Sequence, residues 1–167
     1  GYCTVPSFIM RAWLFLISTI VAPSLWSQTG TLPRTNALVL EFVEGHYGKR
    51  VGRGECWDLA AAALNAAHAR WDGQLVYGRL IDHTKEEVLP GDITQLEEAE
   101  FRWEEAGAVN GITMPHHTVV VTGVKSAGAY TIAHQNMEGI GRKVGRGELA
   151  LSYLIKGRVL IYRPEGD

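Results

Sequence analysis

The sequence contains little of what several common functions require. Its 167 residues carry a net charge of −2 and no run of basic residues, which argues against a nucleic-acid-binding protein. There is no spaced acidic loop of the calcium-binding kind and no close pair of cysteines or histidines of the kind found in zinc sites. We therefore expect neither a metal nor another cofactor. Cysteine is also scarce, since only Cys3 and Cys56 are present.

The N-terminal region has the parts of a signal peptide. Met10-Arg11 is a short cationic start, the run from Ala12 to Trp26 is apolar but short for a membrane span, and the small Ser27 precedes a polar segment. We expect residues 1–27, an upstream extension followed by this signal, to be removed. The protein would then be secreted or periplasmic and free of the membrane. An uncleaved membrane anchor is the alternative.

After cleavage the chain would hold one domain with a single thiol. Residues 28–36 form a linker that contains Thr, Gly and Pro, and residues 37–167 are long enough for one domain with a sizeable core. We expect this domain to be a monomer. Cys56 would be its only cysteine, in a compartment where cysteines are usually paired. A lone thiol there indicates a role of its own.

The residues after Cys56 have the spacing of an α-helix that runs to about Trp71. A helix start presents unpaired backbone N–H groups and the positive end of the helix dipole, and both favour a thiolate. The position therefore suits a nucleophile. The alternative is a buried structural cysteine, which behaves as a small hydrophobe. Side chains at intervals of three and four form one inward face of this helix, namely Cys56, Leu59, Ala60, Ala63, Leu64 and Ala67.

Two segments rich in β-branched residues, 116–124 and 130–136, are predicted to be strands. Side chains alternate between the two faces of a strand, so His117 shares a face with two valines and His116 lies on the other face. The face of His117 is the more apolar one and hence the inward one. The polar residues predicted to point inward are His117, His134 and Asn136.

The short connection between these strands predicts a hairpin. With Ser126-Ala127 at its tip, the expected pairs are Val121 with Ile132, Val119 with His134, and His117 with Asn136. Either His134 or Asn136 would then hydrogen-bond one ring nitrogen of His117 and leave the other for the thiol. This is the nucleophile, base and orienting group of a cysteine hydrolase. Two alternatives are histidines buried as core residues and a zinc set of Cys56, His117 and His134.

The other elements support the core. The stretch 97–105 is acidic, and we interpret it as a solvated face that is anchored by Phe101 and Trp103. The remaining patterns predict a helix over 37–47 with Leu38, Phe42 and Val43 inward, strands over 74–81 and 91–96, a short helix over 149–155 and a closing strand over 159–164.

These features together resemble the CHAP and NlpC-type branch of the papain-like hydrolases. The resemblance covers residues 51–164 and rests on the cysteine at a helix start, Pro90-Gly91-Asp92-Ile93, the strand that begins His117-Thr-Val-Val-Val, and Gln135-Asn136. It implies an α+β, papain-like fold in which the cysteine helix packs on an antiparallel sheet bearing the histidine. It also implies hydrolysis of amide bonds, commonly in the peptides of bacterial cell walls, so the expected partner is peptidoglycan or a peptide substrate.

The resemblance assigns a role to each candidate residue. Cys56 would be the nucleophile, His117 the base and later the acid, and His134 the orienting group, with Asn136 a second polar residue of the CHAP pattern. CHAP proteins typically carry glutamate where His134 stands, whereas NlpC-type relatives use histidine. Glu55 is a further departure, because a carboxylate beside the thiol opposes thiolate formation unless it is paired, for example with Arg53.

Two other functions fit the same residues. One is a binding module without catalysis that keeps the fold, and it predicts a thiol of ordinary reactivity at Cys56. The other is an acyltransferase that uses the same Cys and His pair but passes the acyl group to an amine instead of water.

Overall fold

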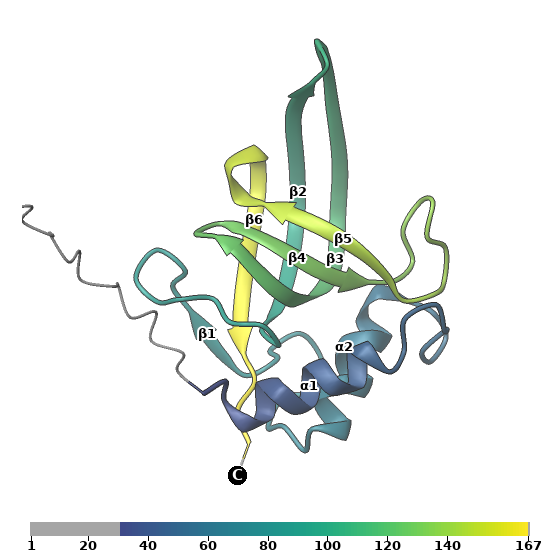
Figure 1. The fold of residues 1–167 in the computed structure, drawn as a ribbon, viewed down its shortest axis with the longest axis vertical. Coiled ribbons are helices and arrows are strands. Elements are labelled where there is room, and N and C mark those ends of the chain that lie inside the picture. The colour runs from purple at the N-terminus through teal and green to yellow at the C-terminus, as the bar shows by residue number, and fades with distance from the viewer. Residues whose placement is uncertain (1–30, 167) are drawn as a thin grey trace, which may run out of the picture. The chain divides into compact units, whose positions relative to one another are not determined.

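The computed structural model describes residues 31–166, and the predicted signal peptide lies outside them. Two α-helices, α1 (Arg34–Glu44) and α2 (Cys56–Ala66), accompany six strands and a 3₁₀ turn, η1 (Leu151–Tyr153) (Figure 1). None of these helices combines the length and the apolar character of a membrane span. The strands are β1 (Arg79–Ile81), β2 (Ile93–Glu105), β3 (Ala108–Ser126), β4 (Ala129–His134), β5 (Gly145–Ala150) and β6 (Leu154–Arg163).

All six strands join one antiparallel sheet in the order β1-β6-β2-β3-β4-β5. The helix α2, which begins at Cys56, packs on this sheet together with α1. The α+β, papain-like architecture predicted from the sequence is therefore confirmed.

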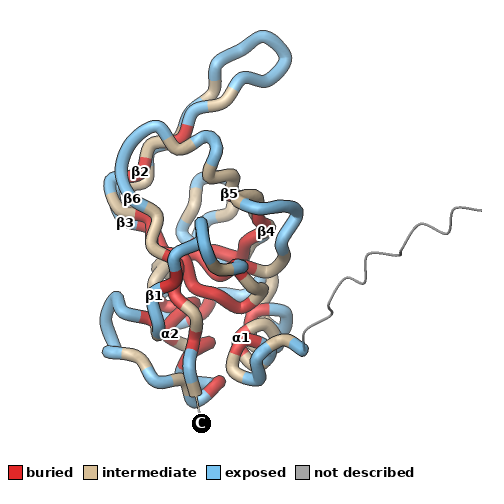
Figure 2. Tube along the Cα trace, turned by 90° about the vertical axis from the view of Figure 1, so that its left-hand side faces the viewer, coloured by how far each residue is buried: buried red, intermediate tan, exposed pale blue. Residues whose placement is uncertain are grey.

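The sheet carries a hydrophobic core on each of its two faces. The side chains of Leu59 and Leu64 in α2 pack with Val120 of β3 and Ala133 of β4, on what we call the helix face. The opposite face, which we call the far face, has its own buried cluster. Figure 2 shows the buried residues concentrated around the sheet and the end of the long hairpin exposed. The main far-face residues are Leu96, Val119, Val121, Ile132, Leu149 and Ile161.

The long hairpin of β2 and β3 is kinked part-way along. The kink lies at Glu98, which has a left-handed φ of 48°, opposite Pro115, which has no N–H to give to the ladder. Ile93, before the kink, belongs to the helix-face core, whereas Ala99 and Phe101, after it, belong to the far-face cluster. Odd-numbered residues of β2 thus change faces at the kink.

Several predicted bounds are wrong. The helix α1 begins at Arg34, so the predicted linker over 28–36 ends earlier than expected. The helix α2 ends at Ala66 instead of near Trp71, because His68 takes a left-handed φ of 53° that breaks the helix. Of the predicted strand over 74–81 only the last three residues are β-structure. The acidic stretch 97–105 lies in the outer part of β2, and Phe101 and Trp103 anchor it to the core as predicted.

The C-terminal helix predicted over 149–155 does not form either. Those residues end β5, make the turn η1 and start β6, which passes straight through Gly157 at a φ of 87°. The predicted pair of Val121 and Ile132 is confirmed. The turn that follows is one residue later than predicted, because two irregularities in the β3–β4 ladder shift the register until Ser126 pairs with Ala129.

Candidate active site

The thiol stands at the first residue of α2. Glu55 precedes it as the N-cap residue and forms a reciprocal capping box with Asp58. The backbone N–H of Arg53 donates to Asp58 Oδ2 at 2.7 Å, and the Arg53 guanidinium lies 3.2 Å from Oδ1. Cys56 itself is partly buried and is a free thiol. These contacts fix the loop that leads into the helix.

Gln135 ties this helix start to the end of β4. Its buried amide nitrogen donates to the carbonyl of Glu55 at 2.7 Å and to that of Val51 at 3.0 Å. Its oxygen accepts from the Val51 N–H at 3.3 Å. The residue before Cys56 is therefore held against the sheet by a side chain that lies 80 positions further along the chain.

Asn136 does not point inward as predicted. It is exposed, with a left-handed φ of 62°, because β4 ends at His134 and the backbone turns away. Its amide donates to Glu55 Oε2 at 2.7 Å and makes no contact with His117. The alternation rule holds only while the chain stays extended, and here the strand ends two residues before Asn136.

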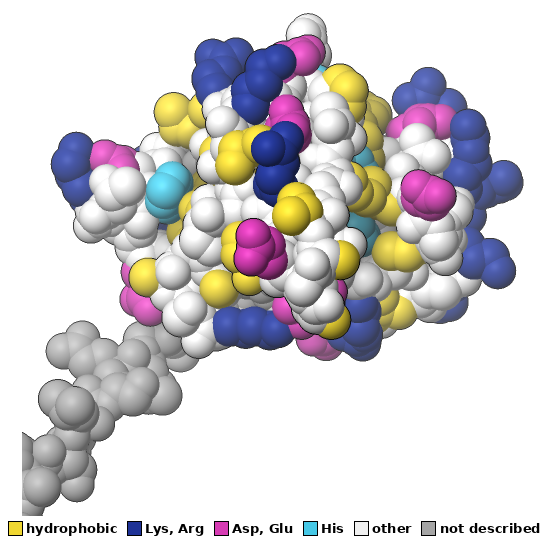
Figure 3. All heavy atoms as spheres, turned by 90° about the horizontal axis from the view of Figure 1, so that it is seen from above, with side chains coloured by type: hydrophobic (Ala, Val, Ile, Leu, Met, Phe, Trp, Pro, Cys, Tyr) yellow, Lys and Arg dark blue, Asp and Glu magenta, His cyan; other side chains and the backbone are white. Residues whose placement is uncertain are grey.

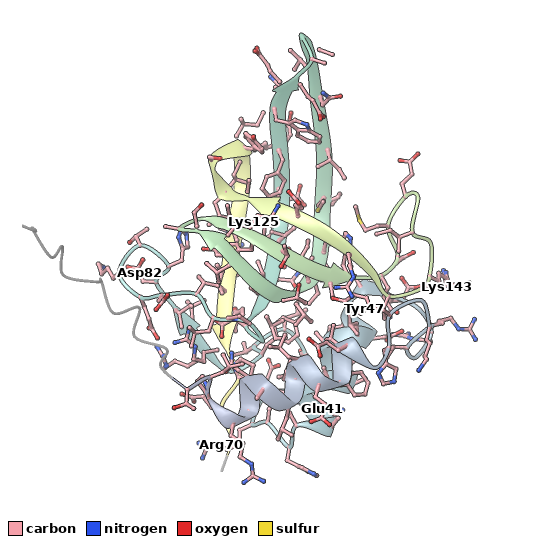
Figure 4. The ribbon with its side chains drawn as sticks, in the orientation of Figure 1. Glu41, Tyr47, Arg70, Asp82, Lys125 and Lys143 are labelled. Carbon is pink, nitrogen blue, oxygen red and sulfur yellow. The ribbon has the colours of Figure 1, made fainter. Side chains whose placement is uncertain are left out.

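The carboxylate of Glu55 is paired, but not with Arg53. Arg142 lies 3.2 Å from Glu55 Oε1, and Asn136 occupies the other oxygen. Arg142 belongs to the loop between β4 and β5, where Figure 4 labels Lys143, and Tyr47 lies beside this loop through a bridge to Val144. The negative charge next to the thiol is thus offset by a guanidinium from another part of the chain.

A chain of buried polar groups lies on the helix face. The hydroxyls of Tyr77 and Thr118 both donate to Gln95 Oε1, at 3.0 and 2.7 Å. Two donors on the oxygen fix the orientation of the amide. Burial raises the pKa of Tyr77, and the interaction of Tyr77 with Cys56 raises it further. The two side chains are therefore close enough to interact electrostatically.

His116 and Glu97 continue the chain toward solvent. Gln95 Nε2 donates to Glu97 Oε1 at 3.0 Å, and His116 Nδ1 lies 3.0 Å from Glu97 Oε2. The same amide nitrogen packs 3.3 to 3.4 Å from both nitrogens of the His116 ring. The His116 side chain is 48% exposed, so a substrate can approach it.

His117 and His134 form a separate pair. His117 Nε2 lies 3.3 Å from His134 Nδ1, so His134 does bind a ring nitrogen of His117. Both side chains are buried. Burial lowers the pKa of His117 to about 4, with the charges of His134 and His116 adding to the effect, and burial lowers the pKa of His134. Both rings are uncharged near neutral pH.

The pair lies on the far face of the sheet, whereas α2 covers the helix face. His117 alternates with Val119 and Val121 of the far-face cluster. Thr118, which follows His117, donates to Gln95 and lies 3.1 Å from the Tyr77 hydroxyl on the helix face. The sequence predicts that the more apolar face of β3 meets the thiol. The sheet has a buried core on both faces, so apolar character alone does not identify the face that α2 covers.

The residues between 31 and 166 contain no group of three or more His, Cys, Asp or Glu side chains arranged to hold a metal ion. The helix face carries an imidazole, a carboxylate and neutral hydrogen-bonding groups, and the thiol stands at the start of the helix that covers this face.

Comparison with known proteins identifies the fold. A family model described as the AIM3/BBC1 cysteine proteinase-fold domain matches residues 34–167. The chain belongs to this family. The match agrees with the papain-like architecture, and it does not single out the narrower CHAP or NlpC-type branch.

Relatives of this AIM3/BBC1 domain include altered inheritance of mitochondria protein 3 of the yeast Debaryomyces hansenii. The two are 32% identical over 152 residues, which cover 78% of this chain and 16% of that protein. The domain thus spans a small part of that relative. It is also similar to two crystal structures of Ly7917, one with the hydrolyzing product of MDP, at 20% and 21% identity and TM-scores of 0.46 and 0.49. These cover 76% and 77% of this chain and 62% of theirs.

Sequence reasoning missed the polar residues of the AIM3/BBC1 domain's helix face. The signal was present as Gln95-x-Glu97 in one strand and His116-x-Thr118 in the next, two polar alternations that pair across the ladder. This pattern indicates a site only when β2 and β3 are known to be neighbours and the face that α2 covers is known. Because Glu97 begins the acidic stretch 97–105, the sequence alone favours a solvent-exposed position for it.

Proposed function

We propose that this domain is a cysteine hydrolase that cleaves amide bonds, with Cys56 as the nucleophile and His116 as its general base. The observation that carries the proposal is the set of polar groups on the helix face. The helix that begins at Cys56 covers the face on which His116 Nδ1 lies 3.0 Å from Glu97 Oε2. Nucleophile, base and orienting carboxylate are the groups that such catalysis requires.

The mechanism follows from the hydrogen bonds. When His116 Nδ1–H donates to Glu97, Nε2 is left to accept the thiol proton. The sulfur of Cys56 then attacks the carbonyl carbon, a C–S bond forms, and negative charge develops on the oxygen near the positive end of α2. The C–N bond breaks as His116 gives its proton to the leaving amine. Water hydrolyses the thioester, with His116 again as base.

The substrate is proposed at two levels. An amide in a peptide is the broad form. The narrow form is an amide in peptidoglycan peptides, and it rests on the resemblance to CHAP and NlpC-type proteins. It also requires export of the enzyme, for which the signal-peptide pattern of residues 10–27 is the basis. The relative with 32% identity comes from a yeast, so peptide substrates are the first to assay and cell walls the second.

A second arrangement uses His117 as the base with His134 as its orienting group, and the 3.3 Å contact between them favours it. Burial works against it. A base must hold a proton for part of the cycle, and the low pKa of His117 shows that its environment disfavours the imidazolium. The His116 side chain, in contrast, is 48% exposed and lies 3.0 Å from the carboxylate of Glu97.

Alkylation of the thiol by iodoacetamide separates these possibilities. In a Cys3→Ser background, Cys56 should react rapidly near neutral pH, because a base holds its proton. Replacement of His116 by alanine should slow the reaction by about tenfold or more, and Glu97→Gln by less, whereas His117→Ala should leave it nearly unchanged. Hydrolysis of peptide substrates should follow the same order, with Cys56→Ala inactive.

The outcomes are distinct. If His117→Ala slows alkylation and His116→Ala does not, the base is on the far face and our assignment fails. If wild-type Cys56 reacts no faster than a free cysteine, the domain is a binding module. Transfer of the acyl group to an added amine, detected by mass spectrometry of the products, would identify an acyltransferase.

A further inference from the structure

A cavity on the far face is not used by the proposed chemistry. It has a volume of about 530 Å³ and lies between the outer half of the β2–β3 hairpin, β5 and η1. Neither Cys56 nor His116 is among its lining residues. Figure 3, which views the molecule from the hairpin end, shows apolar side chains reaching the surface beside acidic ones. The apolar part of the wall includes Leu96, Phe101, Trp103, Ile112, Met114 and Leu149.

The charged side chains of this cavity have one sign. Glu104, Glu105 and Glu148 line it, and no lysine or arginine does. Of the three, Glu148 is paired with Lys125, and Glu104 and Glu105 project from the outer end of β2. An apolar ligand with a positive charge fits such a rim, and an anion is repelled by it.

Aromatic rings strengthen the preference for a cation. Trp103 of β2 and Tyr153 of η1 stack with their ring centroids 6.2 Å apart and an angle of 29° between their planes. Tyr153 is 44% exposed, so the stacked pair is open to a ligand at one side. A guanidinium or ammonium group is attracted to the face of an aromatic ring.

One polar atom in the wall has no partner. His134 lines the cavity, is 5% exposed, and its Nε2 makes no hydrogen bond, while Nδ1 is occupied by His117. The ring lies over Gly147 of β5, where a Cβ would come within 2.9 Å of Nε2. Buried polar atoms normally have partners, so this one points to a group that the isolated domain does not supply.

The edge of β3 beside the cavity is also unoccupied. The strand β4 pairs with β3 only from Val120 onward, so residues 108–119 have no neighbouring strand on that side among the described residues. Unpaired N–H and C=O groups of an edge can accept an added strand. The kink at Pro115 interrupts this edge, which leaves the part from Val109 to Met114 as its regular portion.

We propose that this cavity and the edge of β3 bind an extended segment of a partner protein. The segment adds a strand beside Val109–Met114, places apolar side chains at alternate positions in the cavity, and sets a lysine or arginine near Glu104 and Glu105. Main-chain hydrogen bonds hold the segment, and the cavity selects its alternate side chains. This binding site is separate from the proposed active site on the other face.

A capped hexapeptide with leucine at positions 2 and 4, lysine at position 6 and threonine elsewhere is a suitable first probe, because it presents the leucines and the lysine on one face of a strand. Binding is measured by NMR titration of the whole chain, and we expect shifts and slower hydrogen exchange at Val109–Met114. A peptide with glutamate in place of lysine should bind at least about tenfold more weakly, a difference of about 1.4 kcal/mol. A peptide with serine in place of leucine should also bind more weakly, because it cannot fill the cavity.

Two neighbouring residues provide matched variants. Met114→Glu places a charge in the cavity and should weaken binding about tenfold or more. Thr113→Glu adds the same charge on the other side of the strand and should leave binding intact. Thermal unfolding of both variants checks that each remains folded. Alkylation of Cys56 should be the same in both, so failure here is distinct from failure of the proposed activity.

Four results would overturn the proposal. The first is no binding of the lysine–leucine peptide up to about 1 mM. The second is equal binding of the lysine and glutamate peptides. The third is an equal loss of binding in Met114→Glu and Thr113→Glu. NMR shifts confined to α2 and the helix face would likewise reject the far-face site.

Discussion

The buried pair of His117 and His134 predicts how the stability of the domain depends on pH. In the unfolded chain an ordinary histidine takes up a proton near pH 6.5, whereas in the folded chain burial holds the pKa of His117 at about 4. Between these values the unfolded state binds more protons than the folded state. Stability is therefore complete above about pH 6.5, falls as the pH drops, and levels off below about pH 4.

The size of this effect follows from the shift. A difference of one pKa unit corresponds to about 1.36 kcal/mol, so the shift at His117 corresponds to about 3 kcal/mol between neutral pH and pH 4. The lowered pKa of His134 acts in the same direction. A loss of this size is a large fraction of the free energy of unfolding of a typical domain.

Urea unfolding at several pH values between 7 and 4 measures how steeply the free energy of unfolding changes with pH. We expect the wild type to lose stability more steeply than His117→Gln, which can still hydrogen-bond His134 but takes up no proton. His83→Gln is the control, because His83 is exposed and its removal should leave the slope unchanged. Parallel curves for wild type and His117→Gln would refute the reasoning.

Two further predictions concern stability. Gly73 has a φ of 74° and an added Cβ would meet nothing within 4 Å, so Gly73→Ala should lower the free energy of unfolding by roughly 1 kcal/mol. Gly91 has a φ of 88° and an added Cβ would lie 2.5 Å from the Asn36 carbonyl oxygen, so Gly91→Ala should cost at least about twice as much. Thermal unfolding measures both losses. Equal losses would contradict this. Arg163→Met should cost about 3 kcal/mol or more in urea unfolding, because it strands the fully buried carboxylate of Asp92, which Arg163 meets at 2.9 Å. Adding Asp92→Asn should restore part of the loss, and no restoration would argue against the ion pair as its cause.

The fold could be predicted from the sequence because its main signals are local. The spacing after Cys56 defines the inward stripe of α2, and the β-branched runs define the strands. The structure confirms the predicted pairing of Val121 with Ile132, although the turn lies one residue later than predicted and two irregularities in the ladder restore the register. The contact of His134 with His117 follows from the same alternation.

The site depends on information that a single strand does not contain. Whether His116 or His117 faces α2 depends on where the helix lies, and both faces of β3 are apolar enough to be buried. The kink at Glu98 and Pro115 reverses the alternation in the outer hairpin, and a left-handed residue that is not glycine gives little warning in sequence. The alternation does not apply to Asn136 either, because β4 ends at His134 and Asn136 is no longer in a strand.

The hydrogen bond from Gln135 to the Glu55 carbonyl has a consequence for the order in which the parts of the domain fold. During synthesis the chain emerges with Cys56 long before Gln135, which follows Glu55 by 80 residues. The helix can form early from its own sequence, but its first turn is held in place only once β4 has been made and joined to the sheet. In a newly made chain the residue before Cys56 is therefore not yet held by Gln135, and the environment of the thiol is complete only after β4 has joined the sheet.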